Sequence, residues 1–282
     1  MVQTLDRIWR AEALWKSSLI GYLQHIYRNT HLPSHDLNHH LRVWEYSKQL
    51  LLEMDKVGGL CYDFTVEQVL VACLFHDTGL IYDRGERHGY QSRLICEQFF
   101  NENPYLTIDG FDMVLHAIEH HDDKRVKTDG RGNVQGVDLV TLVSTADDLD
   151  AVGLVGVFRY VEIYALRGVA EMDLPNRVIE NLRNRQANFI KHFSYLKDLS
   201  EHQQKRYSVA LSFFEKLQQE QKADGKQQGD YMQIIRLLID GLINQQGGID
   251  ATIHQGISLA SNPYIVAYFQ GLRDELVVFK TP

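Results

Sequence analysis

Histidine and aspartate stand side by side at His76-Asp77, directly after an apolar run, and this pair is well suited to chemistry. The run, residues 65–75, has the length and apolar spacing of a buried helix, and Thr65 with Gln68 predicts a capping box at its start. An imidazole and a carboxylate are costly to bury without partners. A metal ion bound through the imidazole nitrogen and the carboxylate oxygen would compensate both groups.

Other candidate ligands lie upstream and downstream of this pair. His39 precedes the apolar Val43 by four residues, so both share the inward face of a predicted helix. Asp147 and Asp148 end another apolar run, with Asp150 close behind, and neighbouring carboxylates repel one another unless a cation offsets them. The simpler alternatives are a histidine that caps a helix start and an acidic helix end that faces solvent.

These residues exceed what one metal ion needs. A mixed nitrogen and oxygen set for one divalent ion (Fe, Mn, Ni, Mg or Zn) is formed by His39, His76, Asp77 and Asp147. Further histidines would hold a second ion, namely His88 with His120 or His121, while Asp77 bridges the two. His35-Asp36 is a second dyad, but it follows a loop without an apolar run, so we expect Asp36 to cap a helix or support a ligand.

The elements that must position these side chains are predicted to be helices. Apolar residues recur at helical spacing in residues 8–27, 41–54, 92–100, 111–121, 137–149 and 177–193, and strand-like alternation is hard to find. The sequence therefore predicts an all-α fold, with loops at 30–33, 83–87 and 128–136.

A change of composition near the C-terminus predicts the domain organisation. Residues 218–229 are polar and without apolar anchors, which predicts a surface loop or hinge. We expect a metal-binding helical domain at residues 1–217 and a helical appendage at 230–282. Ile234, Leu238 and their apolar neighbours form too wide a stripe to face water, so the appendage is predicted to pack on the core or on a partner, including a second copy in a homodimer.

Composition excludes several classes of protein. The chain has 282 residues and a formal net charge of -8, which argues against binding nucleic acid or an anionic membrane by bulk electrostatics. Three irregularly spaced cysteines predict no disulfide framework and favour a cytoplasmic location. We identify no apolar segment long enough to span a membrane and no signal peptide layout.

Four motifs resemble the HD superfamily of metal-dependent phosphohydrolases, which are helical proteins named after the His-Asp dyad. Residues 35–43 (HDLNHHLRV) resemble HDxxHxxRV, residues 76–79 (HDTG) the HD dyad, residues 117–121 (AIEHH) the AIxxH helix and residues 146–153 (ADDLDAVG) the ADxLDAxG motif of one bacterial subgroup. The resemblance covers about residues 20–195. It implies an HD-domain helical bundle with extra C-terminal helices, in which His39 is the first ligand and Asp147 the last, and it favours His121 over His120.

The resemblance implies hydrolysis of a phosphate ester, on a nucleotide or another small phosphorylated molecule, by a water that the metal activates. Asp148 or Asp150 would orient that water or act as general base, and Arg42, Lys124 or Arg125 would hold the phosphate. Leu80 stands where the phosphodiesterases that open cyclic dinucleotides usually have lysine. Two alternatives remain open: a di-iron oxygenase of the same fold, and a metal-stabilised module that senses a ligand without catalysis.

Overall fold

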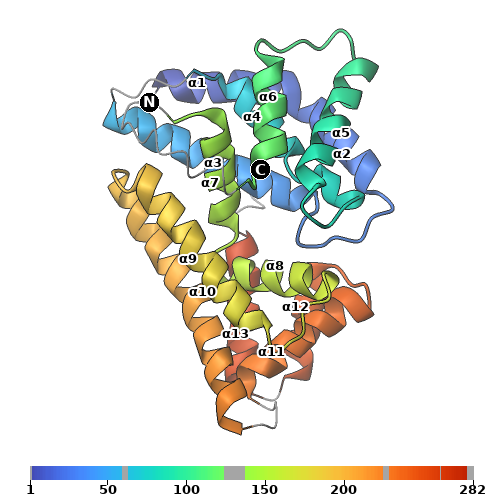
Figure 1. Ribbon diagram of the computed structural model, residues 1–282, viewed down its shortest axis with the longest axis vertical. Helices are drawn as coiled ribbons and strands as arrows, with labels where there is room; N and C mark the ends of the chain where they lie inside the picture. The colour runs from blue at the N-terminus through green and yellow to red at the C-terminus, as the bar shows by residue number, and fades with distance from the viewer. Residues whose placement is uncertain (1, 59–62, 124–136, 225–228, 261, 278–282) are drawn as a thin grey trace. The chain divides into compact units, whose positions relative to one another are not determined.

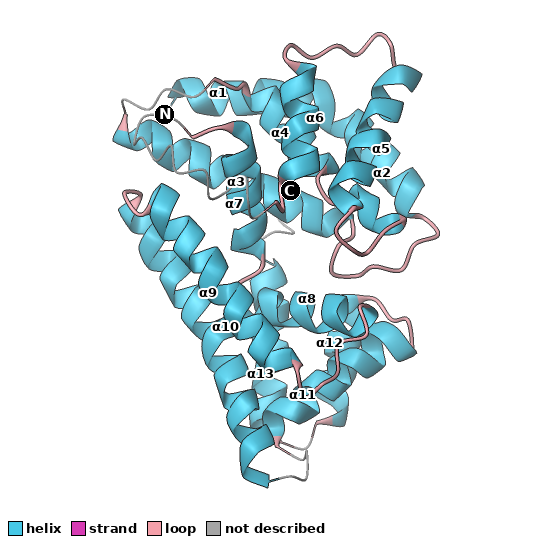
Figure 2. Cartoon of the chain, viewed as in Figure 1, coloured by secondary structure: helices cyan, strands magenta, loops and turns pink. Residues whose placement is uncertain are grey.

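The computed structural model describes residues 2–58, 63–123, 137–224, 229–260 and 262–277, and within these ranges all regular secondary structure is helical (Figures 1 and 2). This confirms the predicted all-α fold. None of the described helices is both long and apolar enough to cross a membrane.

Contacts divide the chain into two compact units, Met1–Leu149 with Asn188–Ser200 and Asp150–Ala187 with Glu201–Pro282. These units do not follow the boundary at residues 217–230, and the predicted division into 1–217 and 230–282 stays a prediction.

The first unit is built around one helix that is apolar on all sides. Its helices are α1 (Val2–Ala11), η1 (Glu12–Lys16), α2 (Ser17–Tyr27), α3 (Leu37–Val57), α4 (Val66–Phe75), η2 (Thr78–Ile81), α5 (His88–Glu102), α6 (Phe111–His120) and α7 (Leu139–Asp150). Helix α4 contacts α1, α2, α3, α5 and α6. Nine of its ten residues are buried, as expected for a helix without a polar face.

The start of α4 carries the capping box predicted from the sequence. The Thr65 hydroxyl accepts the Gln68 backbone N–H at 3.2 Å, and the Gln68 side chain accepts the Thr65 N–H at 2.7 Å. The Gln68 amide also donates to the Asp109 carbonyl at 2.6 Å, just before α6. The cap therefore fixes where α4 begins, and with it the position of the dyad that follows its end.

The second unit has an analogous buried helix, α8 (Gly153–Leu166), in a hydrocarbon core. Helix α8 contacts α11 and α13. The remaining helices are α9 (Leu174–Phe193) and α10 (Lys197–Asp224), each partly in both units, then α11 (Asp230–Ile239), η4 (Asp240–Asn244), α12 (Ile249–Leu259) and α13 (Pro263–Val277). Phe158, Phe214 and Phe269 are completely buried in this core. The apolar C-terminal stripe is therefore covered within the chain itself, because Ile234 and Leu238 lie in the same core.

Two parts of this region differ from the sequence analysis. Residues 218–224 were predicted to be a loop, and this is wrong because α10 continues to Asp224. Glutamine, glutamate, lysine and alanine are good helix formers, so a polar stretch at the exposed end of a long helix needs no apolar anchors. Residues 225–228 and the predicted loop at 128–136 lie outside the described residues. Helix α8 was not predicted.

Candidate metal centre

Side chains of one candidate centre come from the ends of helices in the first unit. Asp36 caps α3, since its carboxylate accepts the backbone N–H of Asn38 at 2.9 Å and of His39 at 3.2 Å, which fixes the turn that carries His39. His76 and Asp77 follow the last residue of α4, and Asp147 lies in the last turn of α7. Helix ends can direct polar side chains to one point while their apolar faces stay in the core.

The first ligand group, defined as His39, His76, Asp77 and Asp147, is buried and has ligand atoms within 4.8 Å of one another. The Nε2 atoms of His39 and His76 are 3.1 Å apart, and they lie 3.4 Å and 3.5 Å from Oδ2 of Asp77. Oδ1 of Asp147 lies 3.6 Å from His39 Nε2. Bonds of about 2.0–2.2 Å to one ion place its ligand atoms roughly 3–3.6 Å apart, so this spacing fits a metal ion.

The second ligand group, defined as Asp77, His88 and His121, uses the other carboxylate oxygen of Asp77. Oδ1 of Asp77 lies 3.4 Å from His88 Nε2 and 3.1 Å from His121 Nε2, and the two imidazole nitrogens are 3.4 Å apart. Asp77 therefore presents one oxygen to each group, which is the arrangement of a bridging carboxylate.

Backbone carbonyl groups fix the orientation of three of these imidazoles. Nδ1 lies 2.7 Å from the Cys73 carbonyl in His76, 2.7 Å from the Gly85 carbonyl in His88 and 2.8 Å from the Ile118 carbonyl in His121. Because a carbonyl only accepts hydrogen bonds, Nδ1 carries the proton in each ring. In the neutral rings Nε2 then has a free lone pair, the form in which histidine binds metal.

The second ligand group needs a cation for this reason. Two Nε2 lone pairs and the charged Asp77 oxygen otherwise face one another at 3.1–3.4 Å. Burial alone would lower the pKa of His88, but its hydrogen bond and attraction to Asp77 raise that pKa to about 9. A proton on His88 therefore offsets part of the negative charge in the second ligand group. A divalent ion would offset it for all three ligand atoms.

Asp77 stays ionised despite its burial. Burial raises the pKa of this carboxyl, but attraction to His76 and hydrogen bonds from His121 and His39, which these rings donate when no ion is bound and they are protonated, hold the pKa well below its usual value. His40, by contrast, has a pKa well below the usual range because of burial and of the neighbouring His76 and His39. The centre thus combines a charged carboxylate with an adjacent imidazole that stays neutral.

Two glycines allow the elements of the second ligand group to approach closely. A β-carbon at Gly79, just after the dyad, would collide with the backbone of His88 and Ser92. The Gly79 N–H donates to Ser92 Oγ at 2.8 Å, which fixes η2 against α5. A β-carbon at Gly89 would collide with the Glu119 carbonyl in the last turn of α6. Both positions require glycine so that three separate turns can meet.

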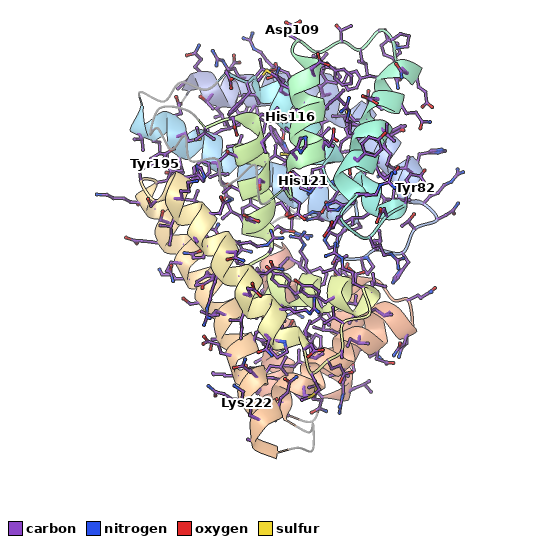
Figure 3. All side chains as sticks on the ribbon, in the orientation of Figure 1. Tyr82, Asp109, His116, His121, Tyr195 and Lys222 are labelled. Atoms are coloured by element: carbon purple, nitrogen blue, oxygen red, sulfur yellow. The ribbon has the colours of Figure 1, made fainter. Side chains whose placement is uncertain are left out.

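The end of α6 decides which of two adjacent histidines joins the centre. Helix α6 ends at His120, and His121 follows as its C-cap residue and is only 2 % exposed (labelled in Figure 3). Its Nε2 lies 3.1 Å from Oδ1 of Asp77. His120 does not belong to either ligand group, and its Nδ1 lies 3.8 Å from Asp123. The structure thus brings together all the predicted ligands except His120.

The predicted catalytic residues lie in different surroundings. Asp148 is buried and accepts a hydrogen bond from Asn188 at 3.2 Å, and Arg42 is buried on α3. Asp150 is fully buried 3.3 Å from Arg159 in the second unit and belongs to neither ligand group. Lys124 and Arg125 lie outside the described residues.

Sequence analysis missed His35 as a neighbour of the centre. Its Nε2 lies 4.0 Å from Oδ2 of Asp77, its ring packs on His39, and its Nδ1 is 2.7 Å from the hydroxyl of Ser34. The residue is only 6 % exposed. A signal was present, because His35 and His39 have the i, i+4 spacing that places two side chains together when a helix begins between them.

A pocket of about 600 Å³ opens beside the second ligand group. Residues 86–90 and 119–123 line it, so His88 and His121 form part of its wall. This volume is in the range of sites for small molecules. The pocket also contains Arg87, which forms no ion pair with any residue that the structure describes, and Tyr90, which is 41 % exposed.

These features define a helical domain with a buried histidine and carboxylate centre built on a His-Asp dyad. Residues 36–152 match the family model of the HD domain. The chain therefore contains an HD domain, as its resemblance to the HD superfamily predicts. Comparison with curated proteins and with solved structures gave no match.

Proposed function

We propose that the first unit is a metal-dependent phosphohydrolase that acts on a small phosphate ester, with a nucleotide as the preferred class. The observation that carries this proposal is Asp77, whose two oxygens each face two imidazole nitrogens within 3.1–3.5 Å. Such a carboxylate is suited to two adjacent divalent ions, from the set Fe, Mn, Ni, Mg and Zn. Bound divalent ions would lower the pKa of a water molecule and neutralise charge on phosphoryl oxygens.

The residues of the pocket would bind and orient the substrate. Arg87 offers a guanidinium group suited to two oxygens of a phosphate, and the exposed ring of Tyr90 offers a surface for a nucleobase. Arg42 and Lys124 remain candidates for the same phosphate contacts.

Asp148 is proposed as the general base or water-orienting group. It follows the ligand Asp147 directly in the sequence, and the hydrogen bond from Asn188 orients its carboxylate. Asp150 is the weaker candidate because Arg159 neutralises its charge at 3.3 Å.

A di-iron oxygenase is the second candidate function, and the shared carboxylate Asp77 favours it. Two ions bridged in this way also suit the activation of oxygen on a diol or phosphonate. A metal-stabilised sensing module is the third candidate, and it predicts binding without turnover.

Purified protein, stripped of metal and reloaded with each ion in turn, would test these functions. We expect phosphate release from nucleotides or hydrolysis of p-nitrophenyl phosphate mono- and diesters with Mn²⁺ or Fe²⁺. The His121→Ala variant should lower this rate, while His116→Ala, an exposed histidine on the same helix, should not. Oxygen consumption without hydrolysis would establish the oxygenase instead, and ion binding with neither reaction would favour the sensor.

A further inference from the structure

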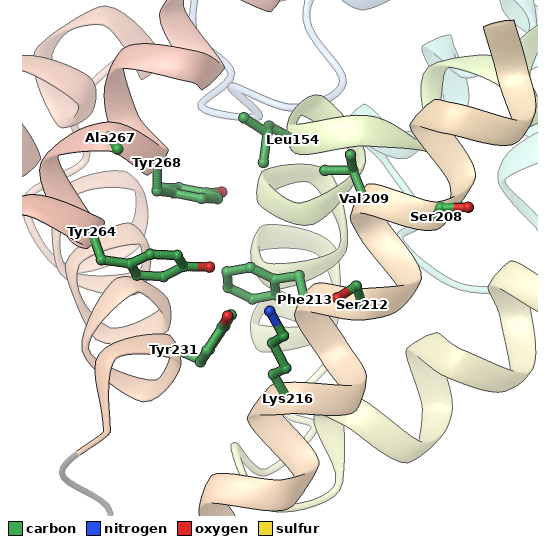
Figure 4. A pocket seen from close by; sticks show the side chains of 10 residues that line it. All are labelled: Leu154, Ser208, Val209, Ser212, Phe213, Lys216, Tyr231, Tyr264, Ala267 and Tyr268. Atoms are coloured by element: carbon green, nitrogen blue, oxygen red, sulfur yellow. The ribbon is translucent and has the colours of Figure 1, made fainter.

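The second unit contains a pocket of about 490 Å³ (Figure 4), and none of its lining residues belongs to either ligand group. Its walls come from α10, α13, the start of α11 and Leu154 of α8. All these residues belong to the second unit.

Aromatic rings dominate the walls of this pocket. Tyr231 and Tyr264 have ring centroids 5.2 Å apart, and Phe213 lies 5.2 Å from Tyr231 and 5.5 Å from Tyr268. The rings come from three helices and surround the space from different sides (Figure 4). Such an arrangement suits a flat ring, which can stack on one tyrosine and meet the edge of another.

The polar groups of the pocket favour an anion. Lys216 places its Nζ 5.8 Å from the centre of the Tyr231 ring and forms no ion pair with a described residue. Ser208, Ser212 and Lys216 share one face of α10 at four-residue spacing, and all three line the pocket. No carboxylate is among the lining residues, although the chain as a whole is acidic.

One carboxylate near these tyrosines, that of Glu220, is already engaged. Glu220 accepts the backbone N–H groups of Tyr231 at 3.2 Å and Met232 at 3.1 Å, at the start of α11. Burial and the hydrogen bond and charge of Tyr231 raise the pKa of Tyr264, and burial raises that of Tyr268. These phenols therefore keep their protons and can donate hydrogen bonds at neutral pH.

Tyr268 supplies an independent indication of a ligand. The residue is 5 % exposed, and its hydroxyl has no hydrogen-bond partner among the described residues. Figure 4 shows the hydroxyl end of this ring directed toward the space between Leu154 and Phe213. A buried hydroxyl without a partner costs about 1–3 kcal/mol, and an acceptor atom of a ligand would remove this cost.

We propose that this pocket binds a small planar aromatic molecule that carries one anionic group, either a carboxylate or a phosphate. The ring would pack against the side chains of Tyr231, Tyr264 and Phe213 that face the pocket, and the anion would reach Lys216 and the hydroxyl of Ser212. This binding site is independent of the proposed hydrolytic reaction.

Isothermal titration calorimetry on the full chain would test the site with defined probes. Indole-3-carboxylate and adenosine 5′-monophosphate represent the two anions, indole and adenosine are their uncharged partners, and acetate and inorganic phosphate lack the ring. We expect saturable binding of at least one of the two charged aromatic probes. Lys216→Met should weaken it about tenfold or more, as expected for losing a charge-assisted contact. The matched control is Lys222→Met on the same helix, which does not line the pocket and should not change binding.

The Asp77→Asn variant separates this site from the metal centre. Probe binding that survives Asp77→Asn but weakens in Lys216→Met would establish the pocket, and the probe that binds would identify the anion. Equal binding by the Lys216→Met and Lys222→Met variants would overturn the proposal, as would binding of neither charged aromatic probe at millimolar concentration. If the unmodified, metal-loaded protein hydrolysed no phosphate ester but bound the probes as expected, the proposed function alone would be contradicted.

Discussion

The two ligand groups that share Asp77 differ in charge. The first ligand group combines His39 and His76 with a second carboxylate, Asp147, whereas the second ligand group contains two imidazoles and no carboxylate of its own. Both are buried and have similar spacing between ligand atoms. Affinity for a divalent cation should therefore differ mainly through electrostatics, with the first site stronger.

Hydrogen bonds to the backbone anchor imidazoles in both ligand groups, including His76 in the first. Both imidazoles of the second ligand group donate from Nδ1 to a carbonyl three residues earlier, and glycines bring their turns into contact. Charge is therefore the difference that should separate the affinities of the two sites.

Removing the shared carboxylate should have the largest effect. Asp77→Asn takes the only carboxylate from the second ligand group and one of two from the first, so both ions should be lost. Turnover should fall by more than about a hundredfold, the upper range for groups one layer further from a metal. Metal content by mass spectrometry and the hydrolysis rate measure this. Asp112→Asn, an exposed carboxylate on α6, is the control, and circular dichroism checks the helices of both variants.

Removing one imidazole should affect a single ion. His121→Ala should lower metal content from two ions to one and reduce turnover about ten- to a hundredfold. His120→Ala, its sequence neighbour, should leave both quantities unchanged because His120 belongs to neither ligand group. If both variants lost the same amount of metal, the second ligand group would not bind an ion.

A change of pH should alter the affinity of the second ligand group for its ion, and this effect should be smaller than those of the two substitutions. The pKa of His88, about 9 without metal, means that an ion must displace a proton at neutral pH. Apparent affinity for the second ion should therefore rise about tenfold per pH unit up to pH 9.

The stability of the metal-free protein should instead fall as the pH rises. A raised pKa stabilises the fold fully below the unfolded value of 6.5, and this contribution disappears as pH rises through 9. Urea unfolding of chelator-treated protein should show this loss of stability between pH 6.5 and 9, and the loss should be smaller in His88→Gln. An identical pH dependence in the variant would exclude His88 as its source.

Local signals in the sequence predicted much of the first unit. The Thr65 cap, the apolar run of α4 and the dyad that follows it are contained in one short segment, and Asp36 caps α3 as expected. Such local signals did not predict helix α8 or the continuation of α10 to Asp224. The first lacks a polar face that would mark its period, and the second is stabilised by helix propensity rather than by an apolar stripe.

The sequence indicated which residues could be metal ligands, but not which of them lie together in the folded chain. Periodicity could not decide between His120 and His121, since that depends on α6 ending at one residue rather than the next. His35 was set aside because its surroundings are a loop, and only the tertiary fold brings it 4.0 Å from Asp77. Contacts between distant turns, such as those at Gly79 and Gly89, have no local signature.

The hydrogen bonds from Nδ1 of His76, His88 and His121 to nearby carbonyls also affect the entropy of binding. A ring flip would exchange Nδ1 with Nε2 and break each bond, so these side chains are already ordered before an ion arrives. Immobilising a side chain costs about 0.5–1.5 kcal/mol of free energy, and for these histidines this loss occurs on folding rather than on ion binding. Ions can therefore enter and leave with little loss of side-chain freedom, and the metal-free protein should keep nearly the same arrangement of ligands.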